Sequence, residues 1–257
     1  MTFSELFTKL KNTFPFNNYL NSHHISDAYQ TVFKISSEYL KENSTVLDIG
    51  SGPGDKTAIV AMQGHKCIAY DDMNDAWHKE PNNEKKISKF LEKMNIQSLD
   101  PALVNLESLD LSLDMIMSND ALEHFHESPK NILLPMLYLL KENGIVFITV
   151  PNAGNIKKRL SLLIGRTNLP PYEAYYWYPG LWRDHIREYV YNDLKQLCFY
   201  LDLNIELLTG VDHMLEKVPK WFLPFYRMIT KLFPHWKDSW ILVARKKPNW
   251  SPHLTQE

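Results

Sequence analysis

The feature that most constrains this chain is the run VLDIGSGPGD at residues 46–55, where an apolar, strand-like stretch ends in alternating glycines. Gly50, Gly52 and Gly54 predict a tight backbone turn between a strand and a following helix. A dinucleotide-binding loop would have its third glycine at position 55, where the start of the helix meets a pyrophosphate. That position holds Asp55, whose carboxylate would repel a diphosphate. The loop therefore argues against NAD or FAD as the cofactor.

From residue 44 to about residue 244 the chain alternates short apolar runs with helical periodicities, which indicates a doubly wound α/β fold. Asp55 is expected to be the N-cap of the first helix of this pattern. The expected strands cover residues 45–49, 66–70, 96–99, 113–118, 144–150, 204–208 and 239–244. The expected helices cover residues 55–61, 83–95, 131–141 and 191–202.

A chain of 257 residues can bury one sizeable core, and we expect a single domain over 1–257. Between the fifth strand and the next helix lies a long segment rich in tyrosine and tryptophan, and connections of this length are usually lids or binding loops. The expected parts are an N-terminal helical segment (1–43), a cofactor-binding core (44–151), a lid or substrate insertion (152–190), C-terminal helices and strands (191–246) and a tail (247–257).

Charge and cysteine content exclude several classes of function. The 28 basic and 30 acidic residues give a formal net charge of -2, so no overall field favours nucleic acid. Only Cys67 and Cys198 are present, which predicts neither a disulfide framework nor a metal-ligand cluster. The start of the chain lacks the apolar core of a secretory signal, and no apolar run is long enough to span a membrane. We expect a cytoplasmic protein without a metal or a nucleic-acid partner, and its oligomeric state stays open.

Acidic residues mark the ends of the first two strands. Asp71 directly follows the second strand, where a carboxylate can accept hydrogen bonds from both hydroxyls of a ribose. Asp72 is the alternative, although strand alternation is expected to turn its side chain away from the cofactor. Asp48 lies inside an apolar strand, where an unpaired carboxylate is costly. It therefore either braces the glycine loop or contacts the cofactor.

The segment DMIMSNDALEHFHESP at 114–129 is a strand that runs into polar residues at the carboxyl edge of the sheet, where ligands bind in such folds. Ser118 and Asn119 are expected to line the cofactor site. His124 can take a proton from a substrate, because an imidazole accepts protons near neutral pH. The alternative is that His124 holds the loop in shape through hydrogen bonds. His126 is expected to be an exposed turn residue.

The segments 46–55 and 114–124 resemble the first and fourth motifs of class I S-adenosylmethionine-dependent methyltransferases. The resemblance is to the type 11-like subgroup that acts on small molecules and occurs with bacterial glycan or secondary-metabolite pathways. It implies a Rossmann-like, doubly wound, seven-stranded and mostly parallel sheet with a reversed last hairpin, and S-adenosylmethionine as the cofactor. It also implies cofactor contacts from Asp48, Gly50, Ser51, Gly52, Asp71 (ribose), Asp100 (near the adenine amino group), Ser118 and Asn119.

The segment DHIREY at 184–189 is similar to a His-x-Arg-Glu segment that closes an aromatic insertion over the active site in related bacterial methyltransferases. That similarity implies that His185 and Arg187 contact the substrate or act as a base and a charge clamp. The alternative is a hinge in which Arg187 and Glu188 pair with the edge of the sheet.

Two aromatic segments each have two interpretations. Tyr176 and Trp177, in the cluster at 172–182, either stack on a sugar or clamp an apolar substrate, or else pack the lid onto the domain. The aromatic and basic segment 214–233 either packs on the fold as an amphipathic helix or hairpin, or makes a peripheral contact with a membrane.

We predict a methyltransferase that acts on an oxygen of a small molecule, with a sugar or glycan precursor as the first choice. The predicted catalytic residues are His124 and His185, and the predicted substrate contacts are Tyr176, Trp177 and Arg187. The alternatives are N-methylation of an amino sugar, a lipid-like or quinone-like acceptor, and a catalytically inactive methyltransferase-like binding module.

Overall fold

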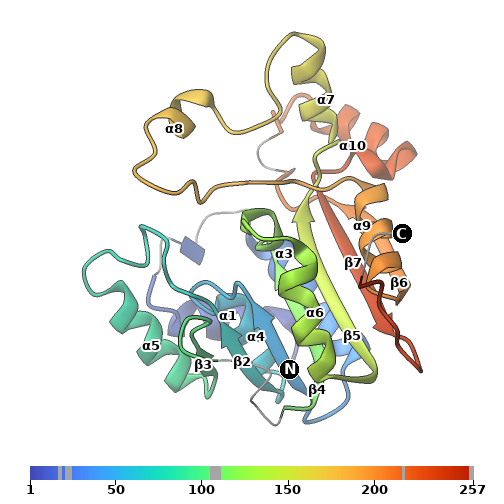
Figure 1. Cartoon of the computed structure of the whole chain (residues 1–257). Helices are drawn as coiled ribbons and strands as arrows, with labels where there is room; N and C mark the ends of the chain where they lie inside the picture. The colour runs from blue at the N-terminus through green and yellow to red at the C-terminus, as the bar shows by residue number, and fades with distance from the viewer. Residues whose placement is uncertain (17–18, 21–24, 105–110, 216–217, 255–257) are drawn as a thin grey trace.

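The computed structural model describes residues 1–16, 19–20, 25–104, 111–215 and 218–254 (Figure 1). The strands are β1 (Thr45–Ile49), β2 (Lys66–Tyr70), β3 (Gln97–Leu99), β4 (Leu113–Asn119), β5 (Leu140–Pro151), β6 (Leu203–Val211) and β7 (Ser239–Lys246). The α-helices are α1 (Phe3–Thr13), α3 (Ile25–Tyr39), α4 (Asp55–Ala61), α5 (Asn83–Lys93), α6 (Pro129–Leu139), α7 (Ile156–Leu163), α8 (Tyr172–Tyr176), α9 (Tyr191–Tyr200) and α10 (Leu223–Leu232). Two short 3-10 helices, η2 (Leu122–His124) and η4 (Pro234–Trp236), complete the list.

The strands form one seven-stranded sheet in the order β3-β2-β1-β4-β5-β7-β6. Strands β1 to β5 pair in parallel, whereas β7 runs antiparallel to both β5 and β6. The doubly wound, mostly parallel sheet with a reversed hairpin is therefore confirmed. Each expected strand and helix is present, with ends that differ by a few residues.

Helices cover both faces of the sheet because the strands are apolar on both sides. In β1, the buried Val46 packs with α1, α3, α4 and α5 on one face. The buried Leu47 and Ile49 pack with α6 and α9 on the other face. The fully buried Asp48 points to the same side as Val46, toward α4, and this orientation decides its partner.

The glycine run turns the chain from β1 into α4. Gly50, Gly52 and Gly54 all have positive φ, at 64°, 53° and 78°, in the left-handed region that glycine adopts without strain. The N-cap of α4 is Gly54, so the expectation that Asp55 caps the helix is wrong. Asp55 is instead the first residue of the helix. There its buried carboxylate accepts a hydrogen bond from the Tyr29 hydroxyl.

The insertion at 152–190 leaves and re-enters the fold at one place. Asn152 and Tyr189 form an isolated β-bridge directly beyond β5, and the Ala153 N–H donates to the Tyr189 carbonyl at 3.1 Å. The insertion carries α7 and α8, and Figure 1 shows α7 above the carboxyl end of β5 with α10 beside it, and α8 farther to the left, on the side of β2 and β3. The insertion therefore starts and ends at the same place, at the carboxyl edge of the sheet, where the glycine loop also lies.

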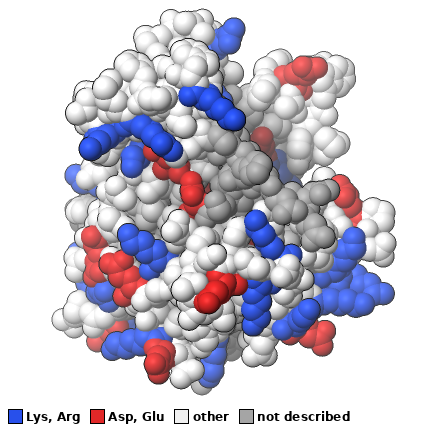
Figure 2. Space-filling view, turned by 180° about the vertical axis from the view of Figure 1, so that it is seen from behind, with Lys and Arg blue, Asp and Glu red and all other residues white. Residues whose placement is uncertain are grey.

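Two further expectations concern the surface and the cysteines. Basic and acidic side chains are interspersed on the face shown in Figure 2, and no region of that face carries one sign of charge alone. Cys67 and Cys198 are buried and unpaired. In the part of the chain that the structure describes, no helix combines the length and apolar character needed to cross a membrane.

We predict that Gly50→Ala and Gly52→Ala differ sharply in stability. A Cβ at Gly52 would meet nothing within 4 Å, so that variant carries only the left-handed strain, roughly 1–2 kcal/mol. A Cβ at Gly50 would lie 2.4 Å from the Ala121 Cβ, and this clash adds roughly 1–3 kcal/mol. Thermal or urea unfolding of both variants measures the difference. Equal stabilities would show that the contact between Gly50 and Ala121 is not tight.

Candidate active site

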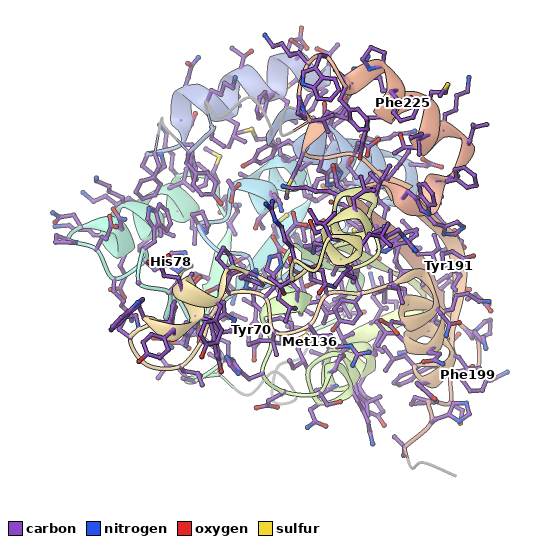
Figure 3. All side chains as sticks on the ribbon, turned by 90° about the horizontal axis from the view of Figure 1, so that it is seen from above. Tyr70, His78, Met136, Tyr191, Phe199 and Phe225 are labelled. Atoms are coloured by element: carbon purple, nitrogen blue, oxygen red, sulfur yellow. The ribbon has the colours of Figure 1, made fainter. Side chains whose placement is uncertain are left out.

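A large cleft opens at the carboxyl ends of β1, β2 and β4. The strand order reverses between β1 and β4, and ligands bind at such a switch point in open α/β sheets. The cleft measures about 1520 Å³, more than the roughly 300–1,000 Å³ of a single ligand pocket. Figure 3 looks down on it and labels Tyr70, His78 and Met136, which line it from β2, the segment after β2, and α6. The cleft has room for two small molecules side by side.

The glycine loop and Asp71 form one wall. Gly50, Ser51, Gly52 and Asp71 all line the cleft. The Asp71 carboxylate accepts the Gly52 N–H at 2.8 Å on one oxygen and the Met73 N–H at 2.8 Å on the other. Burial raises the pKa of Asp71 above its ordinary value. Each oxygen keeps a second acceptor position, so the carboxylate can both hold the loop and bind a pair of hydroxyls.

Asp72 lines the cleft beyond the end of β2, which stops at Tyr70. The expectation that its side chain turns away from the cofactor stays a prediction. The Asp72 carboxylate binds the Arg183 guanidinium of the insertion at 3.3 Å. The acid next to Asp71 thus ties the insertion to the core.

Asp48 and Asp100 lie outside the lining of the cleft. Asp48 is buried beneath the glycine loop, where it accepts the Thr57 hydroxyl at 2.6 Å, and burial raises the pKa of Asp48 to about 7. Asp100 follows β3 and accepts the Ala102 N–H at 2.8 Å, so that Ala102 and its neighbours form that part of the wall. Both acids shape loops of the cleft, and their contact with a cofactor stays a prediction.

The end of β4 forms the second wall. Asn119 lines the cleft and its side-chain Nδ2 is buried without a hydrogen-bond partner among the described residues. Ser118 is fully buried behind it, and its hydroxyl likewise lacks a partner in the described chain. Lys56, from α4, donates to the Asn119 carbonyl at 3.2 Å and pairs with Asp120 at 2.5 Å. The Lys56 side chain therefore connects the wall formed by the glycine loop to the wall formed by the end of β4.

His124 and His185 meet above this wall. Their rings lie edge to face with centroids 5.0 Å apart, and His124 lines the cleft whereas His185 does not. His124 Nδ1 is 2.9 Å from the Arg183 carbonyl, and His185 Nδ1 is 2.7 Å from Glu188. Burial, followed by the nearby His124, lowers the pKa of His185. The structure therefore brings the two predicted catalytic histidines together and puts one of them on the wall.

Glu123 joins these two segments. Its backbone carbonyl accepts the N–H groups of Ile186 at 2.7 Å and Arg187 at 3.2 Å, which docks the segment 184–189 on η2. Its carboxyl group is almost fully buried, and burial, with a contribution from Asp120, raises the pKa of Glu123 to about 8. Glu123 was not among the residues predicted for the site.

The substrate contacts predicted in the insertion do not lie in the cleft. Tyr176 and Trp177 are exposed and pack against each other with ring centroids 4.7 Å apart. Arg187 is exposed and pairs with Asp193 at 3.6 Å. From the insertion, Leu181 and Arg183 line the cleft instead. Contact of the three predicted residues with a substrate stays a prediction.

Several lining residues had no signal in the sequence. The N-terminal segment contributes Tyr19 and Tyr29, and the segments around 78 and 213 contribute His78 and His213. These positions are far from the glycine run in sequence and show no motif, so only the packing of α3 and the loops reveals them. Lys56, adjacent to the run, could have been found from its place in the first turn of α4.

The family described as "Methyltransferase domain" matches residues 21–207, which is most of the chain. The chain belongs to this methyltransferase family. Its resemblance to class I S-adenosylmethionine-dependent methyltransferases is confirmed. The search of curated proteins found no match.

Solved structures share the fold of this methyltransferase at low identity. A cyclopropane-fatty-acyl-phospholipid synthase-like protein from Lactobacillus casei has a TM-score of 0.59 and 12% identity, with 94% of this chain and 99% of that chain covered. A methyltransferase from Aquifex aeolicus has a TM-score of 0.53 and 16% identity, covering 93% and 97%. The 1,6-didemethyltoxoflavin-N1-methyltransferase of Burkholderia thailandensis, with 1,6-didemethyltoxoflavin and S-adenosylhomocysteine bound, has a TM-score of 0.52 and 17% identity, covering 95% and 88%.

The cleft fits S-adenosylmethionine, the cofactor of this class. The backbone at Gly52 borders open space, since a Cβ there would meet nothing within 4 Å, so a ligand can approach it closely. Asp71 offers acceptors to a ribose diol, and the unpartnered Nδ2 of Asn119 offers a donor to a carboxylate. S-adenosylmethionine carries no phosphate, so a glycine at position 55, where this chain has Asp55, is not needed to bind it.

We predict that Asp71→Ala weakens S-adenosylmethionine binding about tenfold or more, because hydrogen bonds to a charged group contribute roughly 1.5–3 kcal/mol. Asp72→Ala is the matched control, since its carboxylate binds Arg183 instead. Isothermal titration of both variants, with folding checked by circular dichroism, measures the effect. If Asp72→Ala lost more affinity for S-adenosylmethionine than Asp71→Ala, then Asp72, and not Asp71, would be the acid that binds the cofactor.

Proposed function

We propose that this enzyme methylates an oxygen of a small molecule, and that the acceptor is a sugar or glycan precursor. The observation that carries the proposal is the place of His124 on the wall of the cleft, with one ring nitrogen held by the Arg183 carbonyl. A carbonyl only accepts, so Nδ1 carries the proton and Nε2 is free to take one. A hydroxyl needs such a proton acceptor when it is methylated.

In this reaction the cofactor supplies a methyl group on a sulfonium, which is already a good leaving group. The residues of the chain therefore need only to orient the two molecules and to remove one proton. Asp71 and the glycine loop would hold the ribose end of the cofactor, and Asn119, with the buried Ser118 behind it, would lie at the amino-acid end. His124 faces the remaining space of the cleft, where the acceptor binds.

The size and lining of the cleft support a polar acceptor. Its volume exceeds that of one ligand pocket, and the segment after β2 contributes Asp75, Trp77 and His78. An aromatic ring beside hydrogen-bonding groups suits the apolar face and the hydroxyls of a sugar. Glu127 and Asn131 add further polar groups on the opposite side, toward α6.

The fold alone leaves the acceptor atom open. One of the similar structures is named as an N-methyltransferase and another as a cyclopropane-fatty-acyl-phospholipid synthase-like protein. An amino sugar or a lipid-like acceptor is therefore the second candidate. An inactive binding module is disfavoured, because the glycine loop, Asp71, Asn119 and His124 share one cleft.

We predict methyl transfer from labelled S-adenosylmethionine to neutral sugars or glycosides in preference to amino sugars and fatty acyl lipids. His124→Gln lowers kcat about 100-fold or more, the usual contribution of a positioned acid or base. Mass spectrometry of the product identifies the methylated atom. The same rate in His124→Gln, or transfer to nitrogen or lipid alone, would contradict the proposal.

We also propose that the segment 214–233 makes a peripheral contact with a membrane surface. Helix α10 packs on the fold by one face, through the buried Tyr226, whose hydroxyl donates to Asp212 at 2.6 Å. Its other face exposes large apolar side chains, and Figure 3 labels Phe225 among them. Arg227 and Lys231 lie on the same helix and can meet anionic headgroups.

The exposed end of α7 extends this apolar surface. Leu162, Leu163 and Ile164 are all more than half exposed, at 54%, 80% and 67%. Arg159 of α7 lies over the ring of Trp236, in η4 directly after α10, at 5.8 Å from its centroid. The two helices thus lie at the same end of the molecule, and contiguous apolar surface of this kind marks an interaction site.

We predict that the wild-type protein floats with anionic liposomes and that Phe225→Glu with Leu232→Glu does not. Each exposed apolar side chain that is buried contributes about 1.5–3 kcal/mol, so the double variant loses most of the binding. Tyr138→Glu, an exposed aromatic position on α6, is the control. Equal flotation of all three proteins, or none by the wild type, would contradict the membrane contact.

A further inference from the structure

We infer that Glu123, His124 and His185 form a binding site for one divalent transition-metal ion. One ligand atom from each of these side chains can be chosen so that all three lie within 4.8 Å of one another. The Nε2 atoms of His124 and His185 lie 3.8 and 3.9 Å from the same oxygen, Oε1 of Glu123. The two histidines come from segments about 60 residues apart, so the fold and not local sequence assembles the site.

Both histidines present an unprotonated nitrogen to the site. His124 Nδ1 is hydrogen-bonded to the Arg183 carbonyl, and His185 Nδ1 to the Glu188 carboxylate. Both partners only accept, so in each neutral ring the proton is on Nδ1 and the lone pair is on Nε2. Metal-binding histidines are oriented in this way, through a carbonyl or carboxylate on the other nitrogen.

Glu123 points into the site without a partner. Its side chain is 1% exposed, and neither carboxylate oxygen has a hydrogen bond to any described residue. A proton on this group would not serve either histidine, because 3.8 Å is too long for a hydrogen bond. Three lone pairs that converge without a donor between them are stabilised by a bound cation.

The two nearby lysines, Lys56 and Lys158, are paired with other carboxylates and not with Glu123. Lys158 pairs with Glu188, and Lys56 pairs with Asp120. Asp184 Oδ1 lies 3.8 Å from His185 Nε2 and is available as a fourth ligand. With both lysines paired elsewhere, the carboxyl groups of Glu123 and Asp184 can supply the negative charge that a divalent cation requires.

The donor set selects the class of ion. Two imidazoles and a carboxylate bind Zn²⁺, Fe²⁺, Mn²⁺ or Co²⁺, whereas Mg²⁺ and Ca²⁺ prefer oxygen ligands throughout. Ligands about 2.1 Å from a tetrahedral ion are about 3.4 Å apart, so the three side chains need to close by less than about 1.5 Å. His124 and His185 are partly exposed, which leaves positions on the ion open to the cleft.

The role of the ion rests on the proposed function, although its binding does not. An ion here would use the Nε2 lone pair of His124, so in the metal-loaded enzyme the ion, and not the His124 imidazole, would lower the pKa of the acceptor hydroxyl. The hydroxyl proton passes to water in the open cleft. The acceptor oxygen forms a bond to the methyl carbon, the bond from that carbon to sulfur breaks, and its electron pair stays on the neutral sulfur. No oxidant or reductant is needed.

The test is metal binding by the whole chain. Protein stripped with a chelator is titrated with Zn²⁺ or Mn²⁺ by calorimetry, and with Co²⁺ by absorption spectroscopy. We expect one ion per chain in the wild type and none in Glu123→Gln or His185→Ala. Glu188→Ala leaves the three ligands intact but removes the acceptor that orients His185, and we expect the affinity for the ion to fall about 10–100-fold.

His126→Gln is the matched control. This histidine lies two residues from His124 and binds the Trp182 carbonyl at 2.6 Å, so it reports on disturbance of the same loop. We expect it to keep its ion. Wild-type protein that binds no ion, or Glu123→Gln that binds as well as the wild type, would overturn the inference.

Failure of the site and failure of the proposed function can be told apart. Metal binding without methylation of any acceptor would refute the function and leave the site standing. Methylation at an equal rate with a chelator and with added ion would refute the role of the ion and leave the function standing. Binding of S-adenosylmethionine by the metal-free protein checks that the cofactor site is folded in each case.

Discussion

The close approach of the glycine loop to the end of β4 is the constraint on which the site depends. A Cβ at Gly50 would meet the Cβ of Ala121 at 2.4 Å, so the two walls touch where a side chain would separate them. The left-handed backbone of Gly50 and Gly52 lets the chain turn there without strain. Asp71 then fixes the turn through the Gly52 N–H. One wall can therefore approach the other while both remain open to a ligand.

The insertion completes the site by a small number of polar contacts. Arg183 binds Asp72, the carbonyl of Glu123 accepts the N–H groups of Ile186 and Arg187, and His185 meets His124. These contacts join the segment 183–189 to both walls. The segment therefore contributes through its charged and histidine residues. The exposed aromatic side chains of the insertion, Tyr172, Tyr175, Tyr176 and Trp177, lie on the outer surface.

Prediction from the sequence was most accurate where a short local pattern is compatible with only one secondary structure. The strands at 45–49 and 66–70 have the expected ends, because β1 and β2 are short, apolar and bounded by polar residues. It was wrong about the Asp55 cap, because the left-handed Gly54 takes that position. Glu123 was missed, since a glutamate in a short polar run shows no sign of its burial.

The sequence by itself determined the class of fold, the cofactor class and one wall of the site. Glycine spacing and apolar periodicity are local, and each follows from backbone sterics and the need to bury apolar side chains. Only the tertiary structure decided which side chains meet: Lys56 with Asp120, Asp72 with Arg183, and Glu123 with two histidines. Such contacts depend on how separate segments pack at the carboxyl edge of the sheet, and spacing along the chain does not encode that packing.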